Sequence, residues 1–314
     1  MSGSVLTEEL GPRGRVRVRN ATIVASIALA AFVGLIVYRL YAQGQFEGRL
    51  WAQYADFETG WPTYLVGGMW DTVRAAVVVM VLASVIGLFL ALVRISPSRP
   101  FRFLAGLVID VFRGPPVLLF IYFSFLALPQ MLPGSLGNPI SRNALYAMII
   151  GLTLYHMAVL AEVFRAGILS LDRGQREAAL GVGMTEGKAM RLVILPQALR
   201  RMIPTIVAQL ATITKDTSLG YIIGLSDDLT GRGRSFAQGS PINDLQTWFG
   251  VGVLYFIVIW GLSRIARRLE VVQRAKLGAG AIEVEGEADL GALAEDVQDD
   301  VSGTARGPGG GATI

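Results

Sequence analysis

Long stretches without a charged side chain constrain this chain more than any other feature. Five of them approach or exceed the ~18 residues that a helix needs to cross a bilayer. They are residues 21–38, 75–93, 114–141, 143–161 and 245–263. A sixth run, residues 202–226, is interrupted only by Lys215 and Asp216. Because hydrocarbon offers no water to the backbone N–H and C=O groups, each run is expected to be a helix. The sequence predicts an all-α integral membrane protein.

These runs take up most of the 314 residues, of which 53% are hydrophobic and 17% are charged. The length would allow two soluble domains, but the apolar runs leave one membrane domain with polar ends. Cysteine does not occur, so disulfides, thiol catalysis and cysteine-based metal sites are excluded. We expect neither a metal nor a cofactor.

The basic residues indicate how the predicted spans are oriented. With six spans and a cytoplasmic N-terminus, the outer side holds few basic residues, among them Arg39, Arg49, Arg142, Arg232 and Arg234. Most of the arginines and lysines near the spans then lie on the cytoplasmic side. Such an excess predicts N-in, C-in topology. The inverted topology would place the polar segment at residues 170–196 outside the cell.

Both ends of the chain differ in composition from its middle. Residues 1–20 form a basic N-terminus, and residues 21–42 are expected to be a retained peripheral transmembrane anchor. A cleaved secretion signal is the alternative. Residues 281–314 contain eight acidic side chains and one arginine, which predicts a disordered cytoplasmic tail. Residues 1–280 carry a net charge of +11, and anionic lipid explains this surplus better than a nucleic acid partner does.

A polar, glycine-broken segment at residues 170–196 separates two of the apolar runs. It has to start a short helix, turn, and lead back into the bilayer. Suitable residues occur in that order, namely Ser170 and Asp172 as N-caps, Gly181 and Gly183 in the turn, Thr185 as a second cap and Pro196 in the first turn of the next helix. We predict a helix–turn–helix elbow here; an ordinary amphipathic loop is the alternative.

The elbow contains Glu177-Ala178-Ala179-Leu180-Gly181-Val182-Gly183 and closes on Ile194-Leu195-Pro196. This pattern resembles the EAA loop of bacterial ABC importer permeases, a cytoplasmic segment that docks into a separate ATPase subunit. The resemblance implies a set of ATPase-coupling residues. They are Glu177, Ala178, Ala179, Gly183, Lys188, Arg191 and Pro196.

Four further stretches narrow the resemblance to the polar amino acid importer family. They are Gly68-Met69-Trp70-Asp71-Thr72-Val73, Phe112-Arg113-Gly114-Pro115-Pro116, Ala161-Glu162-Val163-Phe164-Arg165-Ala166-Gly167-Ile168 and Lys215-Asp216-Thr217-Ser218-Leu219. They follow the family's order over residues 60–265. Pro115 departs from the pattern, because the family often has a small polar residue there. The terminal segments are similar to those of actinobacterial glutamate permeases.

The resemblance implies a type I ABC importer permease fold over residues 60–270, with five core helices and one extra N-terminal helix. It implies a second, similar permease chain, two ATPase subunits and an extracytoplasmic solute-binding protein as partners. The substrate would be an amino acid, glutamate or another polar one. A membrane channel or scaffold without an ATPase partner is the alternative, but a channel needs no docking elbow.

The chain itself is not expected to hydrolyse ATP or to have catalytic residues. Gly187-Lys188 invites comparison with a phosphate-binding loop. That motif needs a glycine five residues before Gly187 and a hydroxyl residue after Lys188. Val182 and Ala189 occupy those positions. Signatures of zinc proteases and serine hydrolases do not occur either.

Charged residues within the sixth run mark a candidate substrate site. If its helix enters the membrane near Ile203, Lys215 lies about 18 Å further on, near the middle of a ~30 Å core. A charge at that depth normally faces a partner or a cavity. Lys215, Asp216, Thr217 and Ser218 would form a polar patch on the pathway, where Lys215 or a hydroxyl meets a carboxylate. An ion pair with another helix is the alternative.

A second candidate site lies near the cytoplasmic end of the fourth run. Glu162 and Arg165 are three residues apart, so they share a helix face and can pair. Glu162 offers a carboxylate to the ammonium group of an amino acid, with Arg165 positioning it; a structural ion pair is the alternative. His156 is expected to be a packed residue that is hydrogen-bonded to a neighbour. These residues leave the choice of amino acid open.

Overall fold

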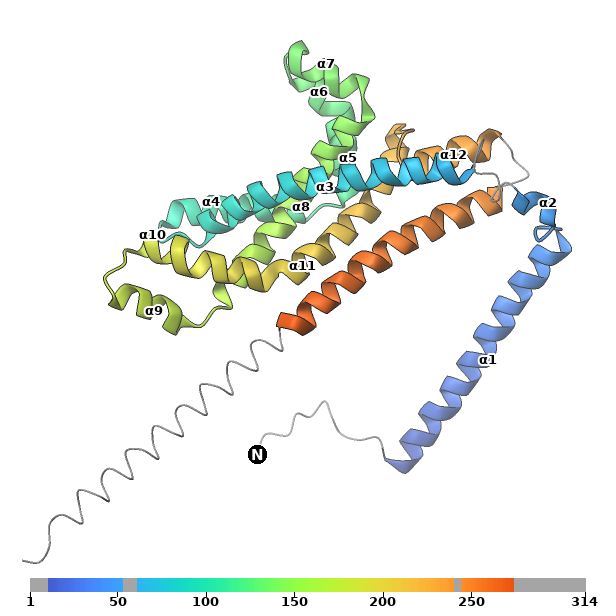
Figure 1. Ribbon diagram of the computed structural model, residues 1–314, viewed down its shortest axis with the longest axis horizontal. Helices are drawn as coiled ribbons and strands as arrows, with labels where there is room; N and C mark the ends of the chain where they lie inside the picture. Colours follow the sequence, from blue (N-terminus) through green and yellow to red (C-terminus); the bar gives the residue numbers. More distant parts are fainter. Residues whose placement is uncertain (1–10, 53–60, 240–243, 274–314) are drawn as a thin grey trace, which may run out of the picture.

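The computed structural model describes residues 11–52, 61–239 and 244–273, and every regular element within them is a helix (Figure 1). This confirms the predicted all-α fold. The predicted disordered tail, residues 281–314, lies outside the described residues. The bundle is built on α3 (Trp61–Arg94), α4 (Arg99–Arg113), α8 (Ala144–Leu169) and α11 (Leu195–Asp216).

The centre of the bundle is α8, which packs against α3, α4, α11 and the short α5 (Val117–Tyr122). Of its most apolar 18-residue stretch, 56% is buried. The approach to α5 is close, because a Cβ on Gly151 would lie 2.6 Å from the Cα of Ile121. Lipid is as apolar as the side chains it would replace, so close packing of this kind stabilises helix contacts inside a membrane.

Two segments of π-helix interrupt the regular helices, and each ends two residues before a proline. Phe123–Ala127 precedes Pro129, and Met190–Ile194 precedes Pro196. Proline lacks an N–H, and its ring clashes with the carbonyl four residues earlier. A wider turn before the proline relieves that clash without ending the helix. The second elbow helix therefore runs without a break from Glu186 through the π segment into α11.

Short helices complete the outer parts of the fold. These are α2 (Gly48–Trp51), α6 (Leu128–Met131), α7 (Gly134–Arg142), α9 (Arg173–Gly181), α10 (Glu186–Ala189), a 3₁₀ segment (Thr217–Ile223) and α12 (Leu229–Gly239). The last described helix is Asp244–Gln273.

Four described helices are long and apolar enough to span a membrane: α1 (Pro12–Ala42), α3, α8 and Asp244–Gln273. The pair formed by Arg99–Arg113 and Val117–Met131, bent by 96°, makes a fifth if it counts as one span. α11 is not among them; it carries Arg200 and Arg201 near its start and two charged residues at its end. The six-span, N-in, C-in arrangement stays a prediction.

α1 runs away from the bundle (Figure 1), and none of its most apolar 18-residue stretch is buried. The segment after it reaches the last helix. The Trp51 and Phe249 rings are 5.6 Å apart, and the Gln246 amide donates to the Gln45 carbonyl at 2.8 Å. α1 is thus joined to the described bundle through its C-terminal end.

Candidate functional site

The elbow forms the helix, turn and second helix that its residue types predict, but Ser170 is the C-cap of α8 rather than an N-cap, and Gly181 ends α9 rather than lying in the turn. Asp172 is the N-cap of α9, and its Oδ1 accepts a hydrogen bond from the Gly174 N–H at 2.9 Å. After the helix, the Gly183 N–H bonds to the Leu180 carbonyl at 2.9 Å and the Met184 N–H bonds to the Ala179 carbonyl at 3.1 Å. These two bonds form a Schellman motif, which needs a left-handed residue after the C-cap. Gly183 is that residue, with φ of 83°.

An ion pair joins the two arms of the elbow. Arg176 of α9 donates to both carboxylate oxygens of Glu186 in α10, at 2.7 and 3.0 Å. Thr185 stands at the N-cap position of α10, but its side chain makes no capping hydrogen bond. Most of the predicted coupling residues are exposed and only Ala179 is buried; the exposed ones are Glu177, Ala178, Gly183, Lys188, Arg191 and Pro196. The elbow thus presents a pre-formed polar surface.

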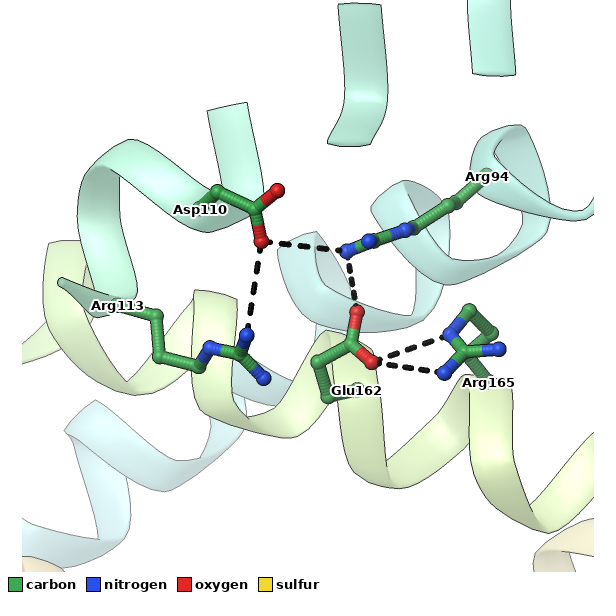
Figure 2. A network of polar contacts seen from close by, with 5 residues as sticks. All are labelled: Arg94, Asp110, Arg113, Glu162 and Arg165. Carbon is green, nitrogen blue, oxygen red and sulfur yellow. Dashed lines mark hydrogen bonds and ion pairs between the residues drawn. The ribbon is translucent and has the colours of Figure 1, made fainter. Parts of the chain in front are cut away.

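Glu162 lies in a network of charges where α3, α4 and α8 meet (Figure 2). One carboxylate oxygen accepts a hydrogen bond from Arg94 of α3, and the other accepts two from Arg165, at 3.0 and 3.1 Å. Asp110 of α4 lies 3.8 Å from Arg94 and 3.6 Å from Arg113. Both oxygens of Glu162 are thus engaged by arginines, which favours the structural alternative for this residue.

The end of α11 separates the residues predicted to act together. The α-helix ends at Asp216, the 3₁₀ segment follows, and Gly224 closes it in the left-handed region with φ of 87°. The Lys215 side chain is exposed, whereas Asp216 is half-buried and lies against α8. Thr217 is buried and donates to the Thr214 carbonyl at 2.8 Å, and Ser218 is half-buried.

Lys215 lines a groove of about 590 Å³ between α11 and the last helix. Arg201, Arg267 and Glu270 line it as well, together with small residues such as Ala208 and Ala211. Asp216 does not line this groove, so the two adjacent charges face different surroundings. His156 of α8 is fully buried beside Asp216, with its Nε2 3.1 Å from the carboxylate Oδ2.

A polar junction at the opposite end of the bundle from the elbow was not predicted from the sequence. Asp228 is the N-terminal cap of α12; its oxygens accept from the N–H groups of Thr230 and Gly231 at 3.3 and 3.0 Å. Thr72 of α3 accepts from the Leu229 N–H at 3.0 Å. The sequence offered one signal for this junction, Asp228 itself, because an aspartate directly before a helix is a common N-cap.

Burial raises the pKa of Asp228 to about 6 from its ordinary value of 3.8, although the backbone hydrogen bonds from Gly231 and Thr230 oppose the shift.

Beside Asp228, Arg232 donates to Asp71 of α3 at 2.7 Å and to the Tyr64 carbonyl at 3.1 Å. These hydrogen bonds hold α12 against α3.

Residues 83–275 match the family described as "binding-protein-dependent transport system inner membrane component". The chain belongs to this family. It is 35% identical over 238 residues to the glutamate transport system permease protein GluD of Corynebacterium glutamicum, covering 75% of this chain and 84% of that one. It is 33% identical over 208 residues to the arginine transport system permease protein ArtQ of Bacillus subtilis, covering 66% of this chain and 91% of that one.

A solved structure, described as an amino acid ABC transporter with histidines, resembles the fold with a TM-score of 0.58. It is 27% identical, and the match covers 67% of this chain and 94% of that one. Together with the apolar helices, family membership identifies a multi-pass membrane protein of the ABC permease type. Membership of this family implies an ABC transporter with ATPase and binding-protein partners.

Proposed function

We propose that this chain is the permease subunit of an ATP-driven amino acid importer. It forms the pathway with a second, similar permease chain, and a solute-binding protein delivers the substrate. Two ATPase subunits dock on the elbow at residues 170–196. The observation that carries the proposal is the elbow itself, a capped helix closed by Gly183, with polar residues exposed on both arms.

The elbow also explains how force would reach the membrane. α10, the π segment and α11 form one continuous helix, so a push on the elbow moves the charged end of α11 as part of a rigid element. Two states that differ in this rotation would be biased by ATP binding to the partner subunits. A channel or scaffold without an ATPase partner has no use for this connection.

The relatives support an amino acid as the substrate. The names of GluD and ArtQ specify glutamate and arginine, which share an α-ammonium and an α-carboxylate group. Among them, the relative that covers most of this chain is named for glutamate, so we propose glutamate or another polar amino acid as the substrate.

We place the substrate contacts at the end of α11. Asp216 offers a carboxylate to the ammonium group, and Ser218 offers a hydroxyl. Lys215 lines the separate groove and would attract a carboxylate along the pathway. Glu162 and Arg165 hold the helices together in this proposal, since arginines occupy both oxygens of Glu162.

Uptake of labelled L-glutamate, L-glutamine and L-arginine tests the proposal in cells that express the chain with its partner subunits. We expect one of these amino acids to accumulate in an ATP-dependent manner and the ATPase subunits to co-purify with the chain. Lys215→Met, which keeps length and helix propensity, should lower uptake while the complex still forms. Equal uptake without the ATPase subunits would favour the channel instead.

A further inference from the structure

A buried histidine links the two central helices beside the charged end of α11. His156 of α8 is 0% exposed and lies between two side chains of α11. Its Nε2 is 3.1 Å from Asp216 Oδ2, and its Nδ1 is 3.0 Å from the Gln209 amide nitrogen. Gln209 and Asp216 are seven residues apart, two helical turns, so both point from the same face of α11 toward α8.

The chemistry of the two neighbours fixes the proton on the imidazole ring. The Asp216 carboxylate accepts hydrogen bonds, so the Nε2 atom that faces it donates. The Gln209 amide nitrogen faces Nδ1 and donates to it. The ring has little freedom to turn, because it also meets Tyr155 edge-on, with centroids 5.1 Å apart and planes at 85°.

The hydrogen bond leaves half of the carboxylate available. Within the described part of the chain, His156 is the one side chain that bonds to Asp216, and it uses Oδ2. The Asp216 side chain is 25% exposed, whereas His156 is completely covered. A ligand can thus reach Asp216 but not His156. The histidine can act on the ligand only by holding the carboxylate in one rotamer.

We propose that His156 is a positioning residue that aims the free oxygen of Asp216 at the ammonium group of the transported amino acid. This inference rests on the proposed function, in which Asp216 contacts the substrate. Gln209 acts one step further away by keeping the hydrogen on Nε2. An orienting group of this kind lowers the entropy that the carboxylate loses when it binds a cationic group.

The test measures the KM and the maximal rate of L-glutamate, L-glutamine and L-arginine uptake by the complete transporter in cells. His156→Met fills a similar volume but cannot donate, so KM for the transported amino acid should rise about tenfold, as for loss of a hydrogen bond to a charged group. His156→Gln keeps a donor for Asp216 and an acceptor for Gln209, and it should restore KM to within about threefold of wild type.

Two further variants separate positioning from packing. Thr153→Val removes another buried polar group from α8, one without a hydrogen-bond partner among the described residues, and should leave KM unchanged. In an Asp216→Asn background, His156→Met should add no further increase in KM, because the two residues act through one contact. Equal effects of His156→Met in both backgrounds would overturn the inference.

The design also covers loss of folding and failure of the proposed site. If the His156→Met protein does not reach the membrane, Gln209→Met is the test of the positioning role. We expect this variant to raise KM about threefold, and an unchanged KM would contradict the inference. If Asp216→Asn itself leaves KM unchanged, the substrate site proposed at the end of α11 is wrong. If Asp216→Asn raises KM but neither His156→Met nor Gln209→Met does, only the positioning role fails.

Discussion

At the scale of single residues, the charges around Glu162 determine how α3, α4 and α8 are held together. The Arg94 and Glu162 side chains are only 24% and 19% exposed, so their ion pair contributes more to the free energy of unfolding than an exposed pair does. Three arginines gather round two carboxylates, and removing one negative charge leaves like charges facing each other.

Glu162→Gln should therefore lower the free energy of unfolding by about 2 kcal/mol, between the values for exposed and buried pairs. Thermal unfolding of the detergent-solubilised protein measures this change. The double variant Arg94→Met with Glu162→Met should recover part of the loss, because Arg94 and Arg165 then no longer face each other without a carboxylate between them. A stable Glu162→Gln protein with a much higher KM for uptake would instead support a substrate role for Glu162.

Asp228 makes a second residue-scale prediction, which concerns pH. Its pKa is raised to about 6, so the folded state binds the proton more tightly than the unfolded chain does. The contribution of this proton binding to the free energy of unfolding is therefore complete below about pH 4 and is lost as the pH rises through 6. Asp228→Asn keeps an N-cap acceptor but removes the charge. The variant should show a smaller loss of melting temperature between pH 4.5 and pH 7.5.

The rise in the pKa of Asp228 limits how much the stability can change with pH. A rise from 3.8 to about 6 corresponds to a change of about 3 kcal/mol at most in the free energy of unfolding. An Asp228→Asn protein whose melting temperature falls with pH as steeply as that of wild type would refute this origin of the pH dependence.

At the scale of elements, the elbow depends on one backbone conformation. A Cβ on Gly183 would meet nothing within 4 Å, so a substitution there acts through the positive φ alone. Gly183→Val should disfavour the Schellman turn by about 1–2 kcal/mol and weaken co-purification of the ATPase subunits, while membrane insertion survives.

Gly181→Val is the matched control for this prediction. Gly181 is the last residue of α9, it also has open space around it, and its φ is not positive. The same side chain at this position should reduce co-purification far less. If both variants assemble and transport normally, Gly183 is not required for docking.

At the scale of the whole molecule, α1 stands outside the bundle that carries the candidate sites. Its apolar stretch is unburied, and the described contacts to the bundle come from the segment after it. Deletion of residues 1–43 keeps Gln45 and Trp51, so the core should still assemble. We expect uptake per molecule in the membrane to stay within about twofold of the full chain.

The level of protein in the membrane has to be measured together with this uptake. A deletion that inserts normally but no longer transports would show that α1 belongs to the transport machinery. A deletion that fails to insert would assign α1 to membrane targeting.

The sequence by itself determined what depends on neighbouring residues. Charge-free runs imposed membrane helices because backbone groups in lipid must bond within their own segment. Asp172 and Gly183 predicted the ends of α9, since capping involves only atoms within a few residues.

The tertiary structure decided which distant side chains meet. Arg94 pairs with Glu162 across 68 positions, His156 with Asp216 across 60, and Thr72 with the Leu229 N–H across 157. Periodicity places a residue on a helix face but does not say which helix covers that face. That choice depends on how closely the helices can pack. For example, Gly151 has no side chain, so α5 can lie directly against α8. The same packing places His156 against Asp216 and turns Lys215 into a different groove.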